Sequence, residues 1–282
     1  GGTSLSKTFN LIERFSEDVD VTIDYRNFID PIDFTKISRT QLKKAIDKLI
    51  VSLKDFVANT VFPFIIEKAK QEFPNHQIKI SLTDDSESLQ FYYPTSLTGM
   101  DASQSYLLDH VLIEFGVKNT TEPSDKCLIT ALLIQALESP LLLPSAHIDT
   151  LSPIRTFWEK ATLIHVACNR GKLVQSPARL SRHWYDLAIL SKSWVGQSAL
   201  KDKVILNNVV QHKKAFFHAS QANYDECLTG NFRLIPNNEE QEILEKDFHQ
   251  MQHSGMFRGA VPAFIEIMNT LQELEIVINH KT

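Results

Sequence analysis

A short alternating segment near the start of the chain predicts a β-strand with acidic side chains on one face. Polar and apolar residues alternate from Asp18 to Asp24, and a period of two is that of a strand whose successive side chains point to opposite faces. Asp18 and Asp20 therefore lie side by side. Two neighbouring carboxylates repel each other unless a cation lies between them. The segment is either one wall of a metal site or simply the solvated face of an amphipathic strand.

A glycine pair and a short predicted helix precede this strand. Leu5, Phe9 and Ile12 recur at helical spacing. Ser4, just before them, is a candidate N-cap, and the free amide groups of a helix start attract phosphate oxygens. The candidate phosphate ligands are Gly2, Thr3, Ser4 and Lys7. The alternative for Ser4 is a capping role alone, and the two roles are compatible.

These residues and three later segments resemble a known family. GGTSLSK (residues 1–7) and RFSEDVD (residues 14–20) resemble the first motif of the AbiEii/AbiGii-type nucleotidyltransferases of the DNA polymerase beta superfamily, which are bacterial toxins found beside a cognate antitoxin. Residues 156–165 and 181–187 are similar to later family motifs, and the C-terminal third ending at Asn279 is similar too. The resemblance covers essentially the whole chain. Family members carry a segment before the glycine pair, so we expect that a preceding piece is missing here.

The resemblance implies both a fold and an activity. The implied fold is α+β, a nucleotidyltransferase-like mixed β-sheet with flanking helices followed by a helical C-terminal half. The implied reaction moves a nucleoside monophosphate from a nucleoside triphosphate (ATP, GTP or CTP) to an acceptor hydroxyl, with magnesium or manganese. Because some related toxins modify the acceptor end of transfer RNA, RNA is the favoured acceptor, while a protein hydroxyl or a small molecule stays open. The implied biological role is a toxin, as in phage defence, restrained by a cognate antitoxin protein.

A third acidic residue interrupts an apolar run at residues 111–116, which has the pattern of a central strand. Burial of the Glu114 carboxylate is costly unless it is hydrogen-bonded, neutralised or bound to a cation. Contact with an arginine or a backbone amide is the alternative. In the family a third acid on a neighbouring strand joins the first two, so the resemblance assigns Glu114 to the metal site with Asp18 and Asp20. Two ions held there would polarise the triphosphate and lower the pKa of the acceptor hydroxyl.

The later motifs contain further candidate catalytic residues. Lys160 lies in a predicted helix, and the resemblance favours a role in neutralising phosphate charge, although periodicity alone fits an ordinary solvated lysine. Asp186 lies among aromatic and apolar residues of another predicted helix, where a carboxylate needs a partner. Arg182, one turn earlier, can supply that partner. Arg182 is also a candidate cofactor-binding residue. Its pair with Asp186 could equally be purely structural.

Other polar residues carry weaker signals. His165 and His183 fit core or helix-end histidines, and we assign them no catalytic role. Residues 212–218 form a basic and aromatic cluster that could contact an RNA backbone and stack a base. An amphipathic helix with a solvated lysine face explains the same cluster, and only the family resemblance makes RNA worth naming.

Composition restricts the class of protein. The chain is 43% hydrophobic and 22% charged, as globular proteins are, and its formal net charge of −5 excludes a uniformly basic surface. Any nucleic-acid contact would be local and salt-sensitive. The three cysteines form no C-x-x-C pair, so neither a disulfide framework nor a zinc site is indicated. No apolar run of membrane-spanning length and no cleavable signal is visible, and we expect a cytoplasmic protein without membrane association.

The elements predicted along the chain suggest two domains. Runs at residues 77–82 and 89–93 predict a hairpin, and a long helical pattern covers residues 40–59. Helical patterns dominate from residue 125 onward. They cover residues 125–138, 156–168, 181–190, 201–217, 239–251 and 260–279. We therefore expect a catalytic α+β domain over residues 1–124 and a helical domain over residues 125–282 that completes the active-site cleft.

Two other functions fit the same residues. One is a nucleotide-binding or antitoxin-binding module that has lost catalysis, against which the retention of Asp18, Asp20 and a third acid argues. The other is a kinase-like phosphotransferase, since carboxylates and a metal also serve transfer of the terminal phosphate. The phosphate that reaches the product separates the two enzymatic reactions.

Overall fold

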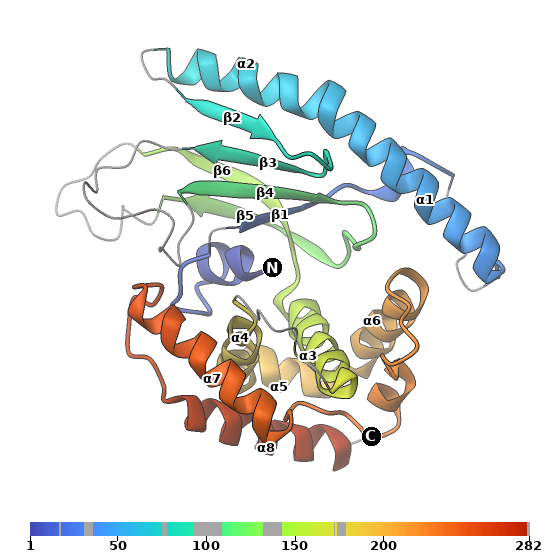
Figure 1. Cartoon of the computed structure of the whole chain (residues 1–282), viewed down its shortest axis with the longest axis vertical. Helices are drawn as coiled ribbons and strands as arrows, with labels where there is room; N and C mark the ends of the chain where they lie inside the picture. The colour runs from blue at the N-terminus through green and yellow to red at the C-terminus, as the bar shows by residue number, and fades with distance from the viewer. Residues whose placement is uncertain are drawn as a thin grey trace. The chain divides into compact units, whose positions relative to one another are not determined.

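The structure is a computed structural model in which the chain divides into two compact units (Figure 1). One unit comprises Gly1 and Ser16–Thr121, and the other comprises Gly2–Phe15 and Glu122–Thr282. The residues that the structure describes are 1–16, 18–30, 36–74, 78–92, 109–131, 143–171, 173 and 179–280. The α+β fold predicted from the sequence, with a mixed sheet and helices in the C-terminal half, is confirmed.

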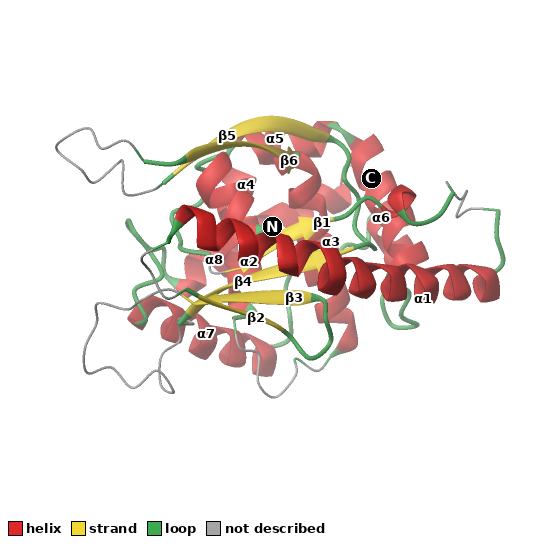
Figure 2. Ribbon diagram, turned by 90° about the horizontal axis from the view of Figure 1, so that it is seen from above, coloured by secondary structure: helices red, strands yellow, loops and turns green. Residues whose placement is uncertain are grey.

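A four-stranded mixed sheet forms the centre of the first unit (Figure 2). Its strands are β1 (Asp18–Thr22), β2 (Lys79–Leu82), β3 (Ser88–Tyr92) and β4 (His110–Gly116). In the order β1-β4-β3-β2, β1 runs parallel to β4, while β3 is antiparallel to both β4 and β2. The hairpin and the central strand predicted from the sequence are confirmed. Residues 77 and 93, at the ends of the predicted hairpin, lie outside the described residues.

A long helical segment follows β1 in the chain. It consists of α1 (Arg39–Phe56), the π-helical turn η3 (Val57–Val61) and α2 (Phe62–Glu72). Ser38 begins α1 with a capping box that it shares with Gln41. Pro63 lies in the first turn of α2. Because proline has no N–H and its ring clashes with the carbonyl four residues earlier, the wider π turn accommodates it within one continuous helical segment.

One face of the sheet packs against this helical segment. The fully buried side chains are Leu49, Leu53 and Val57 of the helices and Leu89 of β3, with Phe115 of β4 nearly so. Alternate residues of the strands point into this core, so the intervening residues share the opposite face of the sheet. The apolar core of the unit thereby determines which strand residues face away from the helices.

The same segment satisfies a simple test for a membrane span. Residues Arg39–Glu72 form the one helix of the described part of the chain that is long and apolar enough to cross a membrane, judged by length and composition alone. Only 17% of its most apolar window is buried. No apolar run of membrane-spanning length was expected from the sequence, whereas this helical segment meets the test for one. A single helix of this kind is weak evidence for a membrane span.

Helices dominate the second unit. They are η1 (Ser4–Thr8), α3 (Pro153–Arg170), α4 (Ser181–Lys192), α5 (Trp194–Lys201), α6 (Lys203–Phe216), η6 (Tyr224–Leu228), α7 (Asn238–His253) and α8 (Phe264–His280). These bounds confirm the helices predicted in the C-terminal half after residue 153 and add α5. One prediction is wrong, because the helix expected over residues 125–138 is instead strand β5 (Ser124–Thr130), paired with β6 (Ser145–Leu151). Residues 132–138 of that expected helix lie outside the described residues.

The C-terminal helix α8 holds an extended segment at residues 232–235. The Asn279 side chain accepts a hydrogen bond from Phe232 N at 2.7 Å and donates one to Phe232 O at 3.0 Å. Trp184 of α4 donates from Nε1 to Leu234 O at 3.0 Å. Side chains thus satisfy backbone groups that have no partner strand, which a buried extended segment requires.

Substitution of Gly196 tests the contact between α4 and α5. A Cβ atom at Gly196 would lie 2.4 Å from the carbonyl oxygen of Ser191 and 2.7 Å from its Cα. These backbone atoms cannot rotate away, so Gly196→Ala is expected to lower the free energy of unfolding by about 1–3 kcal/mol. Urea unfolding measures the change, and Gln197→Ala at an exposed position of the same helix is the matched control. Equal stability of the two variants would contradict this account of the α4–α5 packing.

Candidate active site

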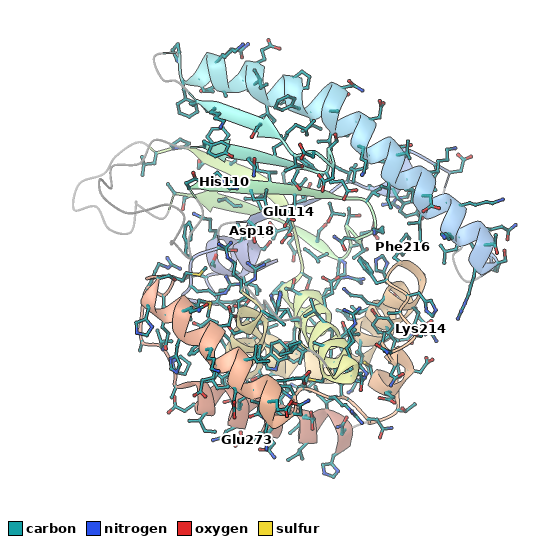
Figure 3. The ribbon with its side chains drawn as sticks, viewed as in Figure 1. Asp18, His110, Glu114, Lys214, Phe216 and Glu273 are labelled. Atoms are coloured by element: carbon teal, nitrogen blue, oxygen red, sulfur yellow. The ribbon has the colours of Figure 1, made fainter. Side chains whose placement is uncertain are left out.

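Three carboxylates predicted to bind a metal share one face of the sheet. Asp20 of β1 pairs with Glu114 of β4 in the parallel register, and Asp18 lies two residues before Asp20 on the same side. Figure 3 shows Asp18 and Glu114 on these neighbouring strands. The face is the one opposite the helix-covered core. Both Asp20 and Glu114 are exposed, with 52% of the Asp20 side chain accessible. The buried environment expected for the Glu114 carboxylate is therefore wrong, because this face of β4 is not covered by the helices of the unit.

The types of donor on this face fit a hard divalent cation, which prefers carboxylate oxygens. Within the described ranges, however, no group of three or more His, Cys, Asp and Glu side chains has a geometry that could hold a metal ion. The register therefore aligns the strands of Asp18, Asp20 and Glu114, while their role as metal ligands stays a prediction.

Gly1 approaches the Asp20 side chain closely. A Cβ atom at Gly1 would lie 1.9 Å from Asp20 Oδ2, so any other residue at this position would push the carboxylate aside. The first glycine of the pair thus leaves room for one of the predicted metal ligands. This contact gives Gly1 a structural reason that the sequence alone did not reveal.

The predicted N-cap role of Ser4 is wrong. The backbone of Thr3 is already helical, with φ −61° and ψ −42°, and Ser4 lies inside the π-helical turn η1. No side chain caps the helix, and the nearby Ser6 hydroxyl donates to Thr3 O at 3.3 Å. Because Gly2 and Thr3 continue the helix backwards, Ser4 lacks the non-helical backbone of an N-cap. Its candidate role in phosphate binding, with that of Gly2, Thr3 and Lys7, stays a prediction.

The candidate residues are divided between the two units. Asp18, Asp20 and Glu114 belong to the first unit. The remaining candidates belong to the second unit, and they are Gly2, Thr3, Ser4, Lys7, Lys160, Arg182 and Asp186. Burial lowers the pKa of the Lys7 ammonium, and the positive charge of Arg258 lowers it further. Arg258 is therefore a second cation close to a predicted phosphate ligand.

A buried ion-pair network connects Lys160 and Asp186 to Arg14. Arg14 donates from Nε to Asp186 Oδ1 and from Nη2 to Asp186 Oδ2, each at 2.7 Å. Lys160 Nζ lies 2.9 Å from Asp186 Oδ2. The side chains of Arg14, Asp186 and Lys160 are 1%, 0% and 8% exposed, respectively. We refer to these three residues as the Arg14 network.

This network corrects the predicted partner of Asp186. Arg182, one turn away on the same helix, was the candidate partner, whereas the carboxylate pairs with Arg14 and Lys160. Arg14 is separated from Asp186 by 172 positions. The RFSEDVD segment that contains Arg14 indicated a functional role. No sequence pattern near Arg14 or near Asp186 predicts that these two residues make contact.

The electrostatics of the network follow from burial and the proximity of charges. Burial alone raises the pKa of the Asp186 carboxyl, but the charges of Arg14 and Lys160 outweigh burial and hold this pKa well below its ordinary value. Burial lowers the pKa of Lys160, which the negative charge of Asp186 opposes. His183, whose Nδ1 lies 3.5 Å from Lys160 Nζ, has a pKa well below 6.5, chiefly because it is buried. A neutral imidazole can accept a hydrogen bond from the ammonium.

The Arg14 network carries a net positive charge. It combines two cations with one carboxylate, so its formal charge is positive. An ammonium has three N–H groups, and the contacts found among the described residues direct two of them to Asp186 and His183. The third N–H group of Lys160 could donate to a phosphate oxygen, and a hydrogen bond between two charged groups is stronger than one between neutral groups. Lys160 is thus a buried, ion-paired lysine and not the ordinary solvated lysine that periodicity alone allowed, while its role as a phosphate ligand stays a prediction.

The interpretation of His165 as a core histidine is confirmed. Its side chain is fully buried, and its Nδ1 accepts a hydrogen bond from Arg233 N at 3.0 Å. Its Nε2 lies 3.2 Å from Asn223 O. Both ring nitrogens therefore have structural partners.

The basic and aromatic cluster at residues 212–218 is largely occupied by internal contacts. Lys214, labelled in Figure 3, pairs with Asp225 at 2.7 Å. Lys213 Nζ lies 4.6 Å from the centre of the Phe217 ring. Lys214 is exposed and Lys213 is half-buried, so the cluster retains part of a solvated lysine face, and a role in RNA binding stays a prediction.

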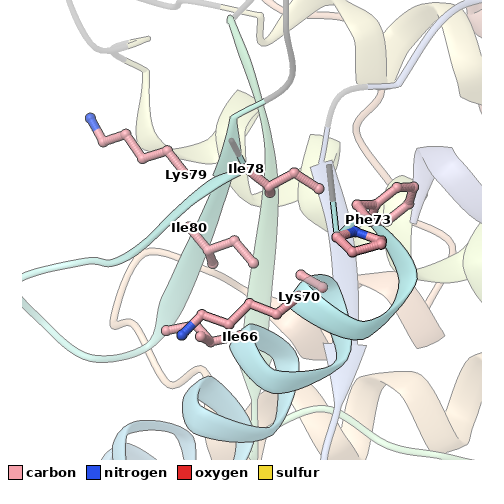
Figure 4. Close-up of a pocket in the computed structure, with 8 residues that line it drawn as sticks. Ile66, Lys70, Phe73, Ile78, Lys79 and Ile80 are labelled. Carbon is pink, nitrogen blue, oxygen red and sulfur yellow. The ribbon is translucent and has the colours of Figure 1, made fainter. Parts of the chain in front are cut away.

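A separate pocket lies between α2 and β2 (Figure 4). Its volume is about 270 Å³. Its lining is mostly apolar with two lysines, and it consists of Ile66, Ala69, Lys70, Phe73, Pro74, Ile78, Lys79 and Ile80. The lining contains no carboxylate, so this pocket is not the predicted metal site.

Comparison with known proteins identifies the family. A family model described as "Nucleotidyl transferase AbiEii toxin, Type IV TA system" matches residues 1–270. No curated protein and no solved structure matches the chain. The family description indicates a nucleotidyl transferase enzyme, hence a nucleoside triphosphate substrate, and a toxin–antitoxin system implies an antitoxin partner. The match spans nearly the whole chain, including the Arg14 network and the three carboxylates. The chain belongs to the AbiEii nucleotidyl transferase toxin family.

Proposed function

We propose that the protein uses a divalent cation, magnesium or manganese, to transfer a nucleoside monophosphate from a nucleoside triphosphate to an acceptor hydroxyl. The observation that carries the proposal is the register of β1 and β4. It pairs Asp20 with Glu114 and leaves Asp18 on the same exposed face. Carboxylates on adjacent strands supply the oxygen ligands that such cations prefer.

The chain's own residues would divide the chemistry. A bound divalent ion supplies charge stabilisation for the triphosphate and activation of the acceptor hydroxyl. Asp18 and Asp20 would hold it, while Glu114 completes the ligand set or accepts the acceptor proton. The acceptor oxygen forms a bond to the α-phosphorus as the bond to pyrophosphate breaks, and pyrophosphate leaves. Lys160 would donate a hydrogen bond to a phosphate oxygen and offset its charge.

The remaining assignments come from the family. We propose RNA, with transfer RNA foremost, as the acceptor, and a cytoplasmic toxin restrained by its cognate antitoxin as the biological role. Thr3, Ser4 and Lys7 are proposed to contact phosphate, as is Gly2 through its backbone. We further propose that residues 1–124 carry the catalytic carboxylates and that residues 125–282 contribute Lys160 and Asp186.

Labelled nucleotides test this function. The protein is incubated with total RNA, magnesium and each triphosphate labelled at either the α- or the γ-phosphorus. We expect RNA to acquire the α label with release of pyrophosphate, and chelation of the metal to abolish labelling. Transfer of the γ label would instead show a kinase-like reaction. Nucleotide binding with neither label transferred to RNA, to protein or to a small molecule would show a binding module without catalysis.

A further inference from the structure

We propose that Arg14 is a positioning residue that holds the Lys160 ammonium in place for a phosphate oxygen, acting through the carboxylate of Asp186. The proposal rests on the function above, in which Lys160 contacts the triphosphate. The Arg14 side chain is 1% exposed, and both carboxylate oxygens of Asp186 receive its N–H groups. It acts on Asp186, and Asp186 acts on Lys160.

The contact between Arg14 and Asp186 has the geometry that fixes a carboxylate most firmly. Two N–H groups of one guanidinium meet the two oxygens of one carboxylate at 2.7 Å. This planar two-point contact determines both the position and the orientation of the carboxylate. With Asp186 fully buried and both its oxygens engaged, it too is a positioning residue and not a group that touches substrate.

The backbone around Arg14 is itself anchored. Phe15 N donates to Met256 O at 2.6 Å, and Arg258 N donates to Glu13 O at 2.9 Å. Arg14 also forms an isolated antiparallel bridge with Phe257. The guanidinium therefore extends from a segment held on both sides, which makes it a rigid support for Asp186.

The contacts that hold the Lys160 ammonium matter because a lysine side chain is flexible. Its four-carbon stem can adopt many rotamers, and its ammonium is a point charge without a preferred plane. Asp186 Oδ2 at 2.9 Å and His183 Nδ1 at 3.5 Å hold two of its N–H groups. Together these contacts determine the direction of the third N–H group. An oriented donor stabilises charge in a transition state without having to reorganise.

Arg14 also determines the charge that a phosphate meets. Asp186 and Lys160 alone would form a neutral pair. With Arg14 neutralising the carboxylate, the positive charge of Lys160 stays uncompensated within the network. The charged or titratable groups that act on Lys160 are Asp186, Arg14, Arg182 and, by hydrogen bonding, His183. Loss of Arg14 would therefore weaken the attraction of the network for phosphate and raise the pKa of the Lys160 amino group.

Two variants of the full chain test the proposal, with two measurements that need no turnover. Arg14→Gln removes the charge, and Arg14→Lys keeps the charge but cannot occupy both carboxylate oxygens. Calorimetry measures the binding of inorganic triphosphate with magnesium. Mass spectrometry after brief reductive methylation over a range of pH gives the pH midpoint at which Lys160 becomes reactive.

We expect Arg14→Gln to weaken triphosphate binding by about tenfold or more, the size of one charge-assisted hydrogen bond, and to move the Lys160 midpoint to higher pH. Arg14→Lys is expected to weaken binding less and to leave the midpoint nearer that of the wild type. Arg155→Gln is the matched control, because Arg155 is also buried, lies on the same helix as Lys160 and pairs with Glu159. A purely structural role for Arg14 would give the same results for the Arg14 and Arg155 variants at matched thermal stability.

The outcomes separate this proposal from the proposed function. Unchanged triphosphate binding in folded Arg14→Lys, or in Arg14→Gln where it folds, overturns the role of Arg14. If the wild type binds triphosphate but transfers no nucleotide, the function fails while a shift in the Lys160 midpoint still supports the positioning role. If Arg14→Gln does not fold, the binding and midpoint of Arg14→Lys decide, since loss of the two-point contact alone should weaken binding.

Discussion

Replacing Asp18 and Asp20 together with asparagine is expected to lower the rate of nucleotide transfer by about a thousandfold or more. Metal ions contribute several kcal/mol to stabilisation of transition-state charge, and about 1.4 kcal/mol corresponds to a factor of ten in rate. Asparagine keeps the size of each side chain but removes the charge that would hold the ion. The measurement is α-label transfer under saturating triphosphate and magnesium.

The matched control for this variant is Asp24→Asn. Asp24 follows the same alternation along the chain, but its carboxylate binds the Arg26 side chain and accepts a hydrogen bond from Arg26 N. We expect the control to retain activity. We also expect Asp18→Asn/Asp20→Asn to be at least as stable as the wild type in urea unfolding, because it removes repulsion between Asp20 and the paired Glu114. Transfer that survives the double substitution would contradict the carboxylate mechanism.

Of the substitutions considered, Asp186→Asn is expected to lower the free energy of unfolding most, by about 3–5 kcal/mol. The substitution removes the negative charge that contacts both buried cations, Arg14 and Lys160, and leaves two buried positive charges in place of one net charge. An uncompensated buried cation must lose its proton, recruit water or disrupt the packing around it. Urea unfolding at neutral pH measures the loss.

The control for Asp186→Asn is Asp225→Asn, which breaks the pair with Lys214 at the surface. The Asp225 side chain is 74% exposed, and exposed ion pairs contribute at most about 1 kcal/mol. A similar, small effect of both substitutions would contradict the assignment of Asp186 as the centre of a tightly coupled buried network.

The buried network also predicts how stability depends on pH. The pKa of Asp186 is lowered in the folded protein, so the folded state binds fewer protons at this group than the unfolded state does. Its contribution is therefore fully present above the unfolded pKa, near 3.8, and is lost as pH falls from there towards the folded pKa. Wild type should lose stability over this acidic range more steeply than Asp186→Asn. Parallel stability curves for the two proteins below pH 4 would refute this assignment.

The candidate site combines features that differ in how far the sequence could predict them. Alternation along β1 was enough to place Asp18 and Asp20 on one face, since the two-residue period depends only on consecutive residues. The apolar run around Glu114 was enough to predict a central strand. That Asp20 and Glu114 are direct neighbours depends on the register between two strands far apart in the chain.

Local patterns misled at two places, and at the first of them the reason is a tertiary contact. Residues 125–130 were predicted as part of a helix, but they belong to β5, with which β6 pairs along its whole length. Ser4 was predicted to cap a helix, but the helical backbone of Thr3 places it within the turn. Helix and strand propensities are weak preferences that such contacts override.

The sequence by itself determined the family, the order of most strands and helices, and the residues on which a nucleotidyl transferase site would be built. These depend on motifs and on periodicities that are read within a few turns of the chain. Only the tertiary structure decided that Glu114 lies opposite Asp20 and that Arg14, rather than Arg182, holds Asp186. Arg14 and Asp186 are 172 positions apart, and contacts at such separation arise from the packing of the whole chain, which no local pattern records.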